Sequence, residues 1–257
     1  MLPTSIILFV AFLAPVFAQN TAPVTITSAT DTSVGLAPAS LATASGMNLA
    51  MQSATAVSTP WPTTLGAVTI QVTDSASVPR AAGLLFVSPT QINFEIPAGT
   101  APGPALVLIN NGVSQTSATL RIQPVAPGLF AINNLGVAAA TGIRIVIPTN
   151  FQSAVTVFQC VDTPGSCRLV PIDPGVDAPV YLSFYGTGIS GRSSLANVTI
   201  TIGGMSFPAL YAGSQSQFPG LDQVNVPLAL SLRGAGVVNV TVTVDGVTSN
   251  PVKIDIM

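Results

Sequence analysis

The sequence of 257 residues predicts an all-β protein of two tandem β-sandwiches, joined by a short β-rich segment that carries a disulfide hairpin. Three observations support this prediction: apolar and polar residues alternate over long stretches, one series of segments occurs twice, and the composition disfavours helices. Hydrophobic residues make up 48% of the chain and charged residues 6%, while the turn formers Gly and Pro number 22 each. A chain of this length can form two domains that each bury a core.

The predicted strands follow from a period of two. Residues 68–73 place three apolar side chains on one face and three polar ones on the other, and residues 198–202 repeat the pattern. Residues 238–244 and 252–256 form the last two strands. Asp245-Gly246 between them predicts a hairpin, because both central residues of a type I′ turn have positive φ. Asn111-Gly112 is its counterpart in the first half.

The two halves align as one unit used twice, with an offset of about 130 residues. The matched positions are Leu65 with Leu195, Gln91 with Gln223, and Gly112 with Gly246. We therefore expect one sandwich over residues 19–128 and a second over 179–257. The connecting segment 129–178 holds a strand at 137–147 and the two cysteines. It forms either a separate β subdomain or extra strands of the second sandwich.

The N-terminus predicts export. Residues 1–18 contain an apolar stretch followed by Val16-Phe17-Ala18, with small residues at the positions that a signal peptidase reads, so we expect cleavage after Ala18. The alternative is an uncleaved anchor helix, for which the apolar stretch is short. Lys and Arg number 7 and Asp and Glu 9, so no field of one sign attracts nucleic acid or an anionic membrane. The expected location is secreted: extracellular, at the cell surface or in the periplasm.

Cys160 and Cys167 flank a Pro-Gly turn between two extended arms, and we expect a disulfide across this hairpin. By the loop-entropy argument it stabilises the ribbon by roughly 2 to 3 kcal/mol. A structural zinc site is excluded by ligand count, because the sequence has two cysteines and no histidine.

Several segments resemble a known family. They are PTTLGAVTIQV, LLFVSPTQINFEIPAGTAPGPA, VAPGLFA, VYLSFYGTGISGRSSLANVTITIGG and LYAGSQSQFPGLDQVNVPLALSLRGAGVVNVTVTVDGVTSN. Together they resemble the secreted Ig-like modules of acidobacteria, described as a Solibacter-type C-terminal domain and similar in style to the IPT/TIG group. The resemblance implies Ig-like sandwiches in a secreted bacterial protein. It implies no activity.

Gln91, Asn93 and Glu95 form a polar row on alternate residues of an apolar run. The second copy keeps both amides, as Gln223 and Asn225, but has proline in place of the carboxylate. A catalytic carboxylate would be retained in both copies, so we interpret the row as architecture, with amides that tie loops to the sheet.

The segment GTGISG, at residues 186–191, matches the dinucleotide-binding pattern G-x-G-x-x-G and follows a strand. The sequence after it predicts another strand rather than a helix whose N-terminus would hold a pyrophosphate. We interpret the segment as a sandwich loop that needs positive φ.

Groups suited to catalysis are scarce, so the sequence predicts no enzyme, no catalytic residue, no metal and no cofactor. Histidine is absent, which excludes Ser-His-Asp and Cys-His machinery. Lys253 is expected to keep an edge strand soluble. Asp173 and Asp177 are the best glycosidase pair, but a Pro/Gly turn explains them more simply. Calcium binding by these or by Asp222 is a weaker alternative, because no Asp-x-Asp array is present.

Exposed aromatic side chains are the remaining candidates for a ligand surface. Trp61, between two prolines, is either an exposed tip or a plug for one end of a sandwich. Tyr185 and Tyr211 lie at strand ends next to glycines and are expected to meet at one rim of the second module. We expect an exported, non-catalytic structural or adhesive protein with extracellular protein partners, or alternatively a carbohydrate-binding module that uses Trp61 or the Tyr185/Tyr211 rim.

Overall fold

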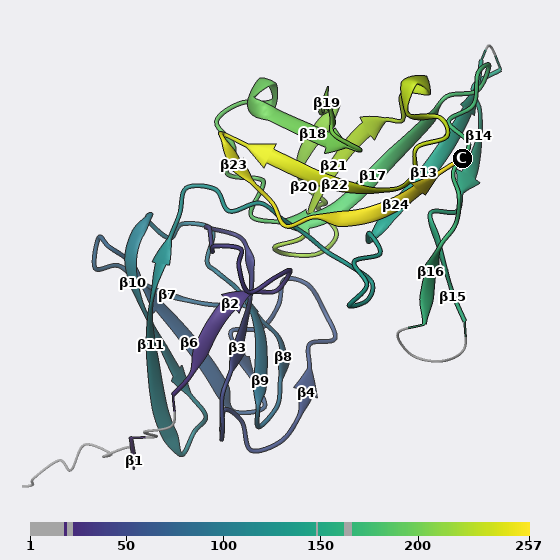
Figure 1. Cartoon of the computed structure of the whole chain (residues 1–257). Coiled ribbons are helices and arrows are strands. Elements are labelled where there is room, and N and C mark those ends of the chain that lie inside the picture. Colours follow the sequence, from purple (N-terminus) through teal and green to yellow (C-terminus); the bar gives the residue numbers. More distant parts are fainter. Residues whose placement is uncertain (1–17, 20–22, 148, 162–165) are drawn as a thin grey trace, which may run out of the picture.

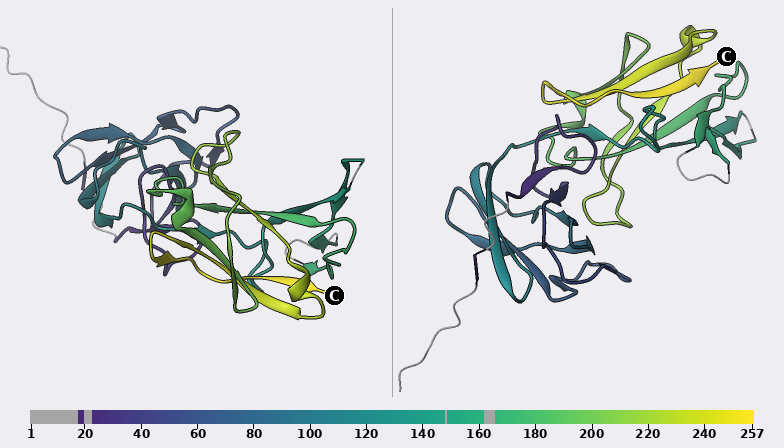
Figure 2. Two further views of the ribbon diagram at one scale, coloured as in Figure 1. Left: turned by 90° about the horizontal axis from the view of Figure 1, so that it is seen from above. Right: turned by 60° about the horizontal axis from the view of Figure 1, so that its bottom comes forward.

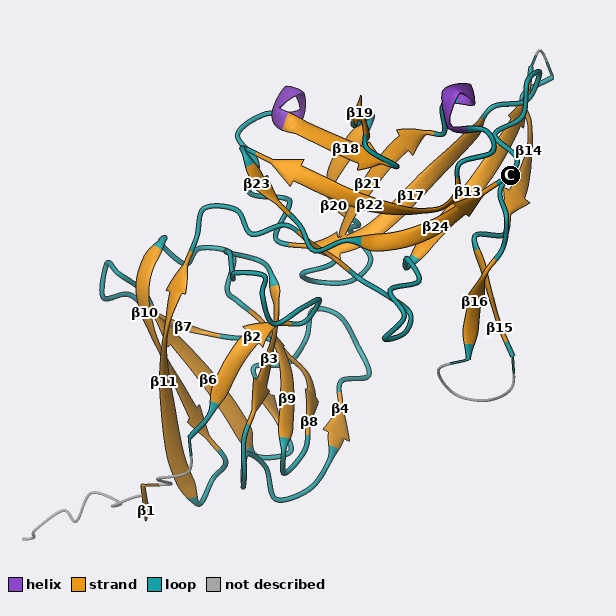
Figure 3. Ribbon diagram, viewed as in Figure 1, coloured by secondary structure: helices purple, strands orange, loops and turns teal. Residues whose placement is uncertain are grey.

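The computed structural model describes residues 18–19, 23–147, 149–161 and 166–257. These residues form two lobes of β-sheet, one purple to teal and the other green to yellow (Figure 1). Strands and loops dominate both lobes, and among the described residues helix is limited to two short 3₁₀ turns, η1 (Leu195–Asn197) and η2 (Leu230–Leu232) (Figure 3). The predicted signal segment 1–18 lies, except for Ala18, outside the described residues.

The first lobe is a sandwich of two sheets. In spatial order, one sheet contains β1 (Ala18–Gln19), β11 (Ser114–Ile122), β10 (Gly103–Asn110), β6 (Val68–Thr73) and β5 (Thr64–Leu65), with β7 (Pro79–Ala81) also paired to β6. The facing sheet contains β2 (Thr25–Ser28), β3 (Leu41–Ser45), β9 (Gln91–Glu95), β8 (Leu84–Val87) and β4 (Ala54–Thr55).

The second lobe repeats this plan. One sheet contains β14 (Phe151–Val155), β13 (Ala140–Val146), β17 (Val180–Thr187), β21 (Asp222–Pro227) and β20 (Tyr211–Ser214), with β12 (Gly128–Leu129) also paired to β17. The facing sheet contains β19 (Met205–Pro208), β18 (Val198–Ile202), β22 (Gly236–Val244) and β23 (Val247–Thr248), with β24 (Val252–Ile256) also paired to β22.

The strand order confirms two tandem Ig-like sandwiches. In the first lobe, β2, β3, β9 and β8 adjoin one another as strands A, B, E and D do in an immunoglobulin domain, and β11, β10 and β6 adjoin as G, F and C. In the second lobe, the series β13, β17, β21 and β20 and the series β24, β22 and β18 take the same places. The two halves of the chain therefore share one topology, as the internal repeat predicts.

The connecting segment extends the second sandwich. β13 pairs with β17 along five residues and β14 pairs with β13, so both are strands of the same sheet (Figure 2). This resolves the alternative that the sequence left open. The rest of the segment forms a separate two-stranded ribbon, β15 (Phe158–Cys160) and β16 (Cys167–Leu169), that projects from the sandwich in Figure 1.

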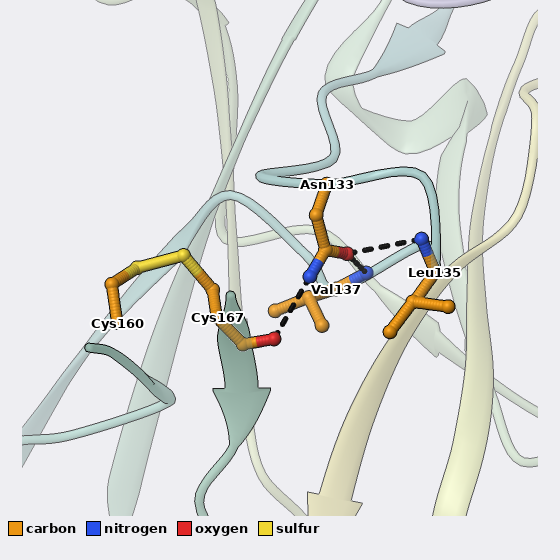
Figure 4. Close-up of a disulfide and its surroundings, with 5 residues drawn as sticks. All are labelled: Asn133, Leu135, Val137, Cys160 and Cys167. Atoms are coloured by element: carbon orange, nitrogen blue, oxygen red, sulfur yellow. Dashed lines mark hydrogen bonds between the residues drawn. A yellow bond between two sulfur atoms is a disulfide. The ribbon is translucent and has the colours of Figure 1, made fainter. Parts of the chain in front are cut away.

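The predicted disulfide joins Cys160 and Cys167, which face each other across this ribbon. The Pro-Gly turn between them lies outside the described residues. Asn133 ties the ribbon to the sandwich: its Nδ2 donates to the carbonyl of Cys167 at 2.8 Å, and its Oδ1 accepts from the amides of Leu135 and Val137 (Figure 4).

Each sandwich has a core of its own, because the apolar members of the alternating strands point between its two sheets. Val68, Ile70 and Val72 are at most 1% exposed in the first lobe, as the period of two predicts. In the second lobe, the inward side chains of β22 and β24 are buried in the same way, except for Val238 at the start of β22, which is partly buried. The apolar area that leaves water in these cores stabilises both folds.

The two predicted hairpins form with different turns. Asp245 and Gly246 have φ values of 47° and 84°, as a type I′ turn requires. At Asn111-Gly112 only the glycine has a positive φ, of 87°. The buried Asn111 side chain holds this loop instead, because its Oδ1 accepts from the amides of Val113 and Ser114.

Candidate binding surface on the second sandwich

All three tyrosines of the chain lie on the outer face of one sheet of the second sandwich. Leu182 and Phe184 of β17 and Val224 and Val226 of β21 are at most 1% exposed and face the core. Side chains on alternate positions of these strands therefore face outward. We call this surface the tyrosine face; it comprises Tyr181, Tyr185, Tyr211, Ser183, Thr141, Gln223 and Asn225.

The register sets these side chains in rows across the strands. Tyr211 is paired with Asn225, which is paired with Ser183, which is paired with Thr141 of β13. In the next row, Gln223 lies between Tyr185 and Gly213. Directly opposed residues share a face of the sheet, so the polar side chains form a strip between the tyrosines.

The ring of Tyr211 lies along its own strand. Its hydroxyl donates to the carbonyl of Ser214, three residues further on, at 2.5 Å. Gly213 lies beneath the ring, because a Cβ placed there would be 3.4 Å from the hydroxyl oxygen and 3.7 Å from Cζ. The hydroxyl end of the ring is therefore held against its own strand, and Nη1 of Arg192 lies 3.5 Å from the same Cβ position. Tyr211 is 40% exposed.

Hydrogen bonds fix the side chains of the polar strip, yet some of their donors and acceptors have no partner in the described part of the chain. Nε2 of Gln223 donates to Oδ1 of Asn225 at 2.7 Å, and the hydroxyls of Tyr185 and Thr141 are 3.2 Å apart. Within the described residues, Nδ2 of Asn225 and Oε1 of Gln223 have no hydrogen-bond partner. A donor and an acceptor thus remain available beside the tyrosine rings.

Tyr185 and Tyr211 share a face, but Trp61 does not join them. Trp61 belongs to the first sandwich, is only 8% exposed and packs at Gly83, so it is a plug rather than an exposed tip. Tyr181 was not among the predicted ligand residues. The sequence could have predicted its place, because Tyr181 and Tyr185 are four residues apart and such residues of a strand lie on the same face.

Two of the carboxylates suggested for catalysis or calcium, Asp173 and Asp222, bind backbone amides and so hold loops in place. Asp173 pairs with Arg233 at 3.1 Å and accepts from the amide of Gly175. Asp222 is 1% exposed and accepts from the amides of Ile189 and Ser190 at 2.6 and 3.1 Å. Burial raises the pKa of Asp222, opposed by these hydrogen bonds. Within the described part of the chain, no group of three acidic, cysteine or histidine side chains suits a metal ion.

The amides of the polar row link strands rather than loops, contrary to the sequence interpretation. Asn93 accepts from Gln91 of its own strand at 2.8 Å and from Thr43 of the neighbouring strand at 3.2 Å. Glu95 makes no hydrogen bond through its carboxylate within the described residues, and burial raises its pKa. The row is thus part of the outer surface of its sheet.

The glycines of GTGISG accommodate the segment that joins the two sandwiches. A Cβ at Gly186 would lie 2.3 Å from the carbonyl oxygen of Gly128, and one at Gly188 would lie 2.1 Å from that of Ala126. Gly188 also has a φ of +73°, which glycine adopts readily. A single 3₁₀ turn and then β18 follow, so no α-helix N-terminus is available for a phosphate.

The described residues contain no helix long and apolar enough to cross a membrane. Neither a protein-family model nor a curated protein matches the sequence. Among solved structures, the chain is similar to bovine butyrophilin at 10% sequence identity, with 92% of this chain and 100% of that chain covered and a TM-score of 0.22. A similarity at this level supports no statement about activity or ligand.

Proposed function

We propose that this protein is an exported, non-catalytic binding protein whose tyrosine face binds a polysaccharide. The signal-like N-terminus and the disulfide support an oxidising compartment outside the cytosol. The resemblance to secreted Ig-like modules of acidobacteria supports the same location. The carboxylates in loops, which fasten backbone amides, support a role without catalysis.

The single observation that carries the proposal is the exposed ring of Tyr211, held at its hydroxyl end, beside a strip of amides and hydroxyls. A sugar ring has an apolar C–H face that stacks on an aromatic ring and a rim of hydroxyls that need donors and acceptors. The tyrosine face presents an aromatic ring and such donors and acceptors in neighbouring positions. Tyr181 and Tyr185, about 13 Å apart along β17, lengthen the surface so that it suits an extended chain rather than a single sugar.

Titration calorimetry with soluble β-glucan, xylan, mannan and chitooligosaccharides tests the proposal. We expect one of these polymers to bind and Tyr211→Ala to weaken that binding by about tenfold, since a stacked ring contributes on the order of 1 to 2 kcal/mol. Phe151→Ala is the matched control, because Phe151 is an aromatic residue that is 65% exposed but lies outside the tyrosine face. Equal affinities of the two variants, or no binding of any polymer, would contradict the proposal.

A second candidate function is adhesion through a strand edge. β14 is the last strand of its sheet, and its residues Phe151–Ala154 are all exposed and uncharged. Such an edge offers unpaired backbone groups to a strand from another protein. In this case sedimentation velocity should detect concentration-dependent association that Gln152→Lys suppresses, while polysaccharide binding is absent.

A further inference from the structure

A cavity of about 470 Å³ lies between the two sandwiches. Its walls are mainly apolar and come from both lobes: Leu41, Trp61 and Leu85 from the first, and Phe130, Phe218 and Leu221 from the second. None of its lining residues is ionisable. Because both sandwiches contribute walls, the cavity is formed at the junction between them.

A hydrogen bond beside the cavity joins the two lobes. The Oγ1 of Thr187, in the second sandwich, accepts from the amide of Leu41 at 2.8 Å and donates to the carbonyl of Gly220 at 2.7 Å. The loop at Gly220 is seated closely on the first sandwich, because a Cβ there would lie 2.9 Å from the side chain of Leu41. The cavity walls are thus connected by one hydrogen bond and by close packing between the lobes.

The polar part of the lining is the amide pair of the first copy, together with Thr43. Oδ1 of Asn93 already accepts from Gln91 and from Thr43. Within the described residues, Nδ2 of Asn93 and Oε1 of Gln91 have no partner. One donor and one acceptor therefore stand at one side of an otherwise apolar space.

We propose that this cavity binds a small, neutral, largely apolar organic molecule that carries one amide, aryl amine or hydroxyl group. The volume falls in the range of small-molecule pockets. A charged ligand would lose hydration without gaining a counter-ion, and a sugar would leave most of its hydroxyls unpaired against the apolar wall. The ligand class thus differs from that of the tyrosine face, and the two proposals stand independently.

Trp61 is the only tryptophan of the chain and lines the cavity, so it reports directly on occupancy. The probe is N-phenyl-1-naphthylamine, which is neutral and aromatic and has one N–H donor. Titrated into the full chain, it should quench Trp61 saturably, with one site per chain. Phe218→Ala should weaken binding at least tenfold; Phe218 is 52% exposed in a loop, so the fold should tolerate this change. Tyr211→Ala should leave the affinity unchanged.

A second variant addresses the cavity by filling it. Ala29→Phe places a ring into the space from the first sandwich and should abolish saturable quenching, with an unchanged far-ultraviolet spectrum. Quenching that does not saturate, or an affinity that is the same in the wild type, Phe218→Ala and Ala29→Phe, would overturn the proposal. Polysaccharide binding is measured separately, so its failure leaves this test unaffected.

Discussion

Gln223 donates a hydrogen bond from Nε2 to Oδ1 of Asn225, two residues further along the same strand, at 2.7 Å. The first copy contains the same bond, from Gln91 to Asn93 at 2.8 Å. Both sandwiches therefore contain the same amide pair with the same hydrogen bond. The surroundings differ, because one pair lies among tyrosines on an open face and the other lines an apolar cavity between the lobes.

Gly213→Val should displace the ring of Tyr211. The new side chain would occupy the space beneath the ring, where a Cβ lies within 3.4 Å of the hydroxyl oxygen. We expect polysaccharide affinity to fall about as much as in Tyr211→Ala, since the stacking surface is lost in both. Calorimetry measures the affinity, and a circular dichroism spectrum equal to that of the wild type is the control. Unchanged affinity would show that this position of the Tyr211 ring is not needed for binding.

Phe94→Ala should destabilise the first sandwich alone. Phe94 is fully buried, and removal of such a side chain costs about 3 to 5 kcal/mol. The cores of the two lobes are separate clusters, so the second sandwich should keep its stability. Hydrogen exchange measured by mass spectrometry separates the two lobes. Equal loss of protection in both would show that they unfold as one unit.

Acid should weaken the first sandwich through Asp74. Hydrogen bonds from the amides of Ala101, Val78 and Ala76 and from Arg80, the Ala101 bond strongest, lower the pKa of Asp74 to about 2. A carboxyl group whose pKa is depressed on folding stabilises the protein above its unfolded pKa, near 4, and this stability is lost as the pH falls toward 2. Urea unfolding from pH 5 to pH 2 should show this loss. Asp74→Asn should be less stable at pH 7 and show a weaker decline.

Glu95→Gln should stabilise the protein at neutral pH. Burial raises the pKa of Glu95, so ionisation of its partly buried carboxyl group disfavours the folded state. The pH dependence of this contribution is opposite to that of Asp74. The contribution of Glu95 to stability is most favourable below its unfolded pKa and is lost as the pH rises through its folded pKa. Thermal unfolding should give the variant a higher midpoint at pH 7 and an equal midpoint at pH 3. A lower midpoint at pH 7 would mean that the carboxylate has a stabilising role.

Loss of the disulfide should have a local effect. A double change of Cys160 and Cys167 to serine removes a crosslink worth roughly 2 to 3 kcal/mol to a short loop. Within the described residues, β15 and β16 pair with each other and with no other strand. Asn133 and the side chain of Phe158, which packs against the core, connect the ribbon to the sandwich. Hydrogen exchange should therefore rise in residues 158–169 and remain unchanged in β17 and β22. Faster exchange in those central strands would indicate that the ribbon supports the whole second sandwich.

Much of the local structure could be predicted from the sequence. Alternation identified the core faces of β6, β18, β22 and β24, because the period of a strand determines which side chains share a face. The pairing of Cys160 with Cys167 followed from their number and spacing. Asn111-Gly112 shows the limit of local signals, because a buried asparagine side chain replaced the expected turn type.

The sequence by itself determined the all-β class and the inward side of the regularly alternating strands, since these depend on the order of apolar and polar residues along the chain. Only the tertiary structure decided what lies above each outer face. Gln91-Asn93 and Gln223-Asn225 have the same local pattern, yet the lobes meet over the first pair and leave the second beside Tyr211. Packing between distant segments likewise decided that Trp61 is buried. An alternating pattern states that residues share a face, but packing between distant segments decides whether that face meets water, a cavity or another sheet.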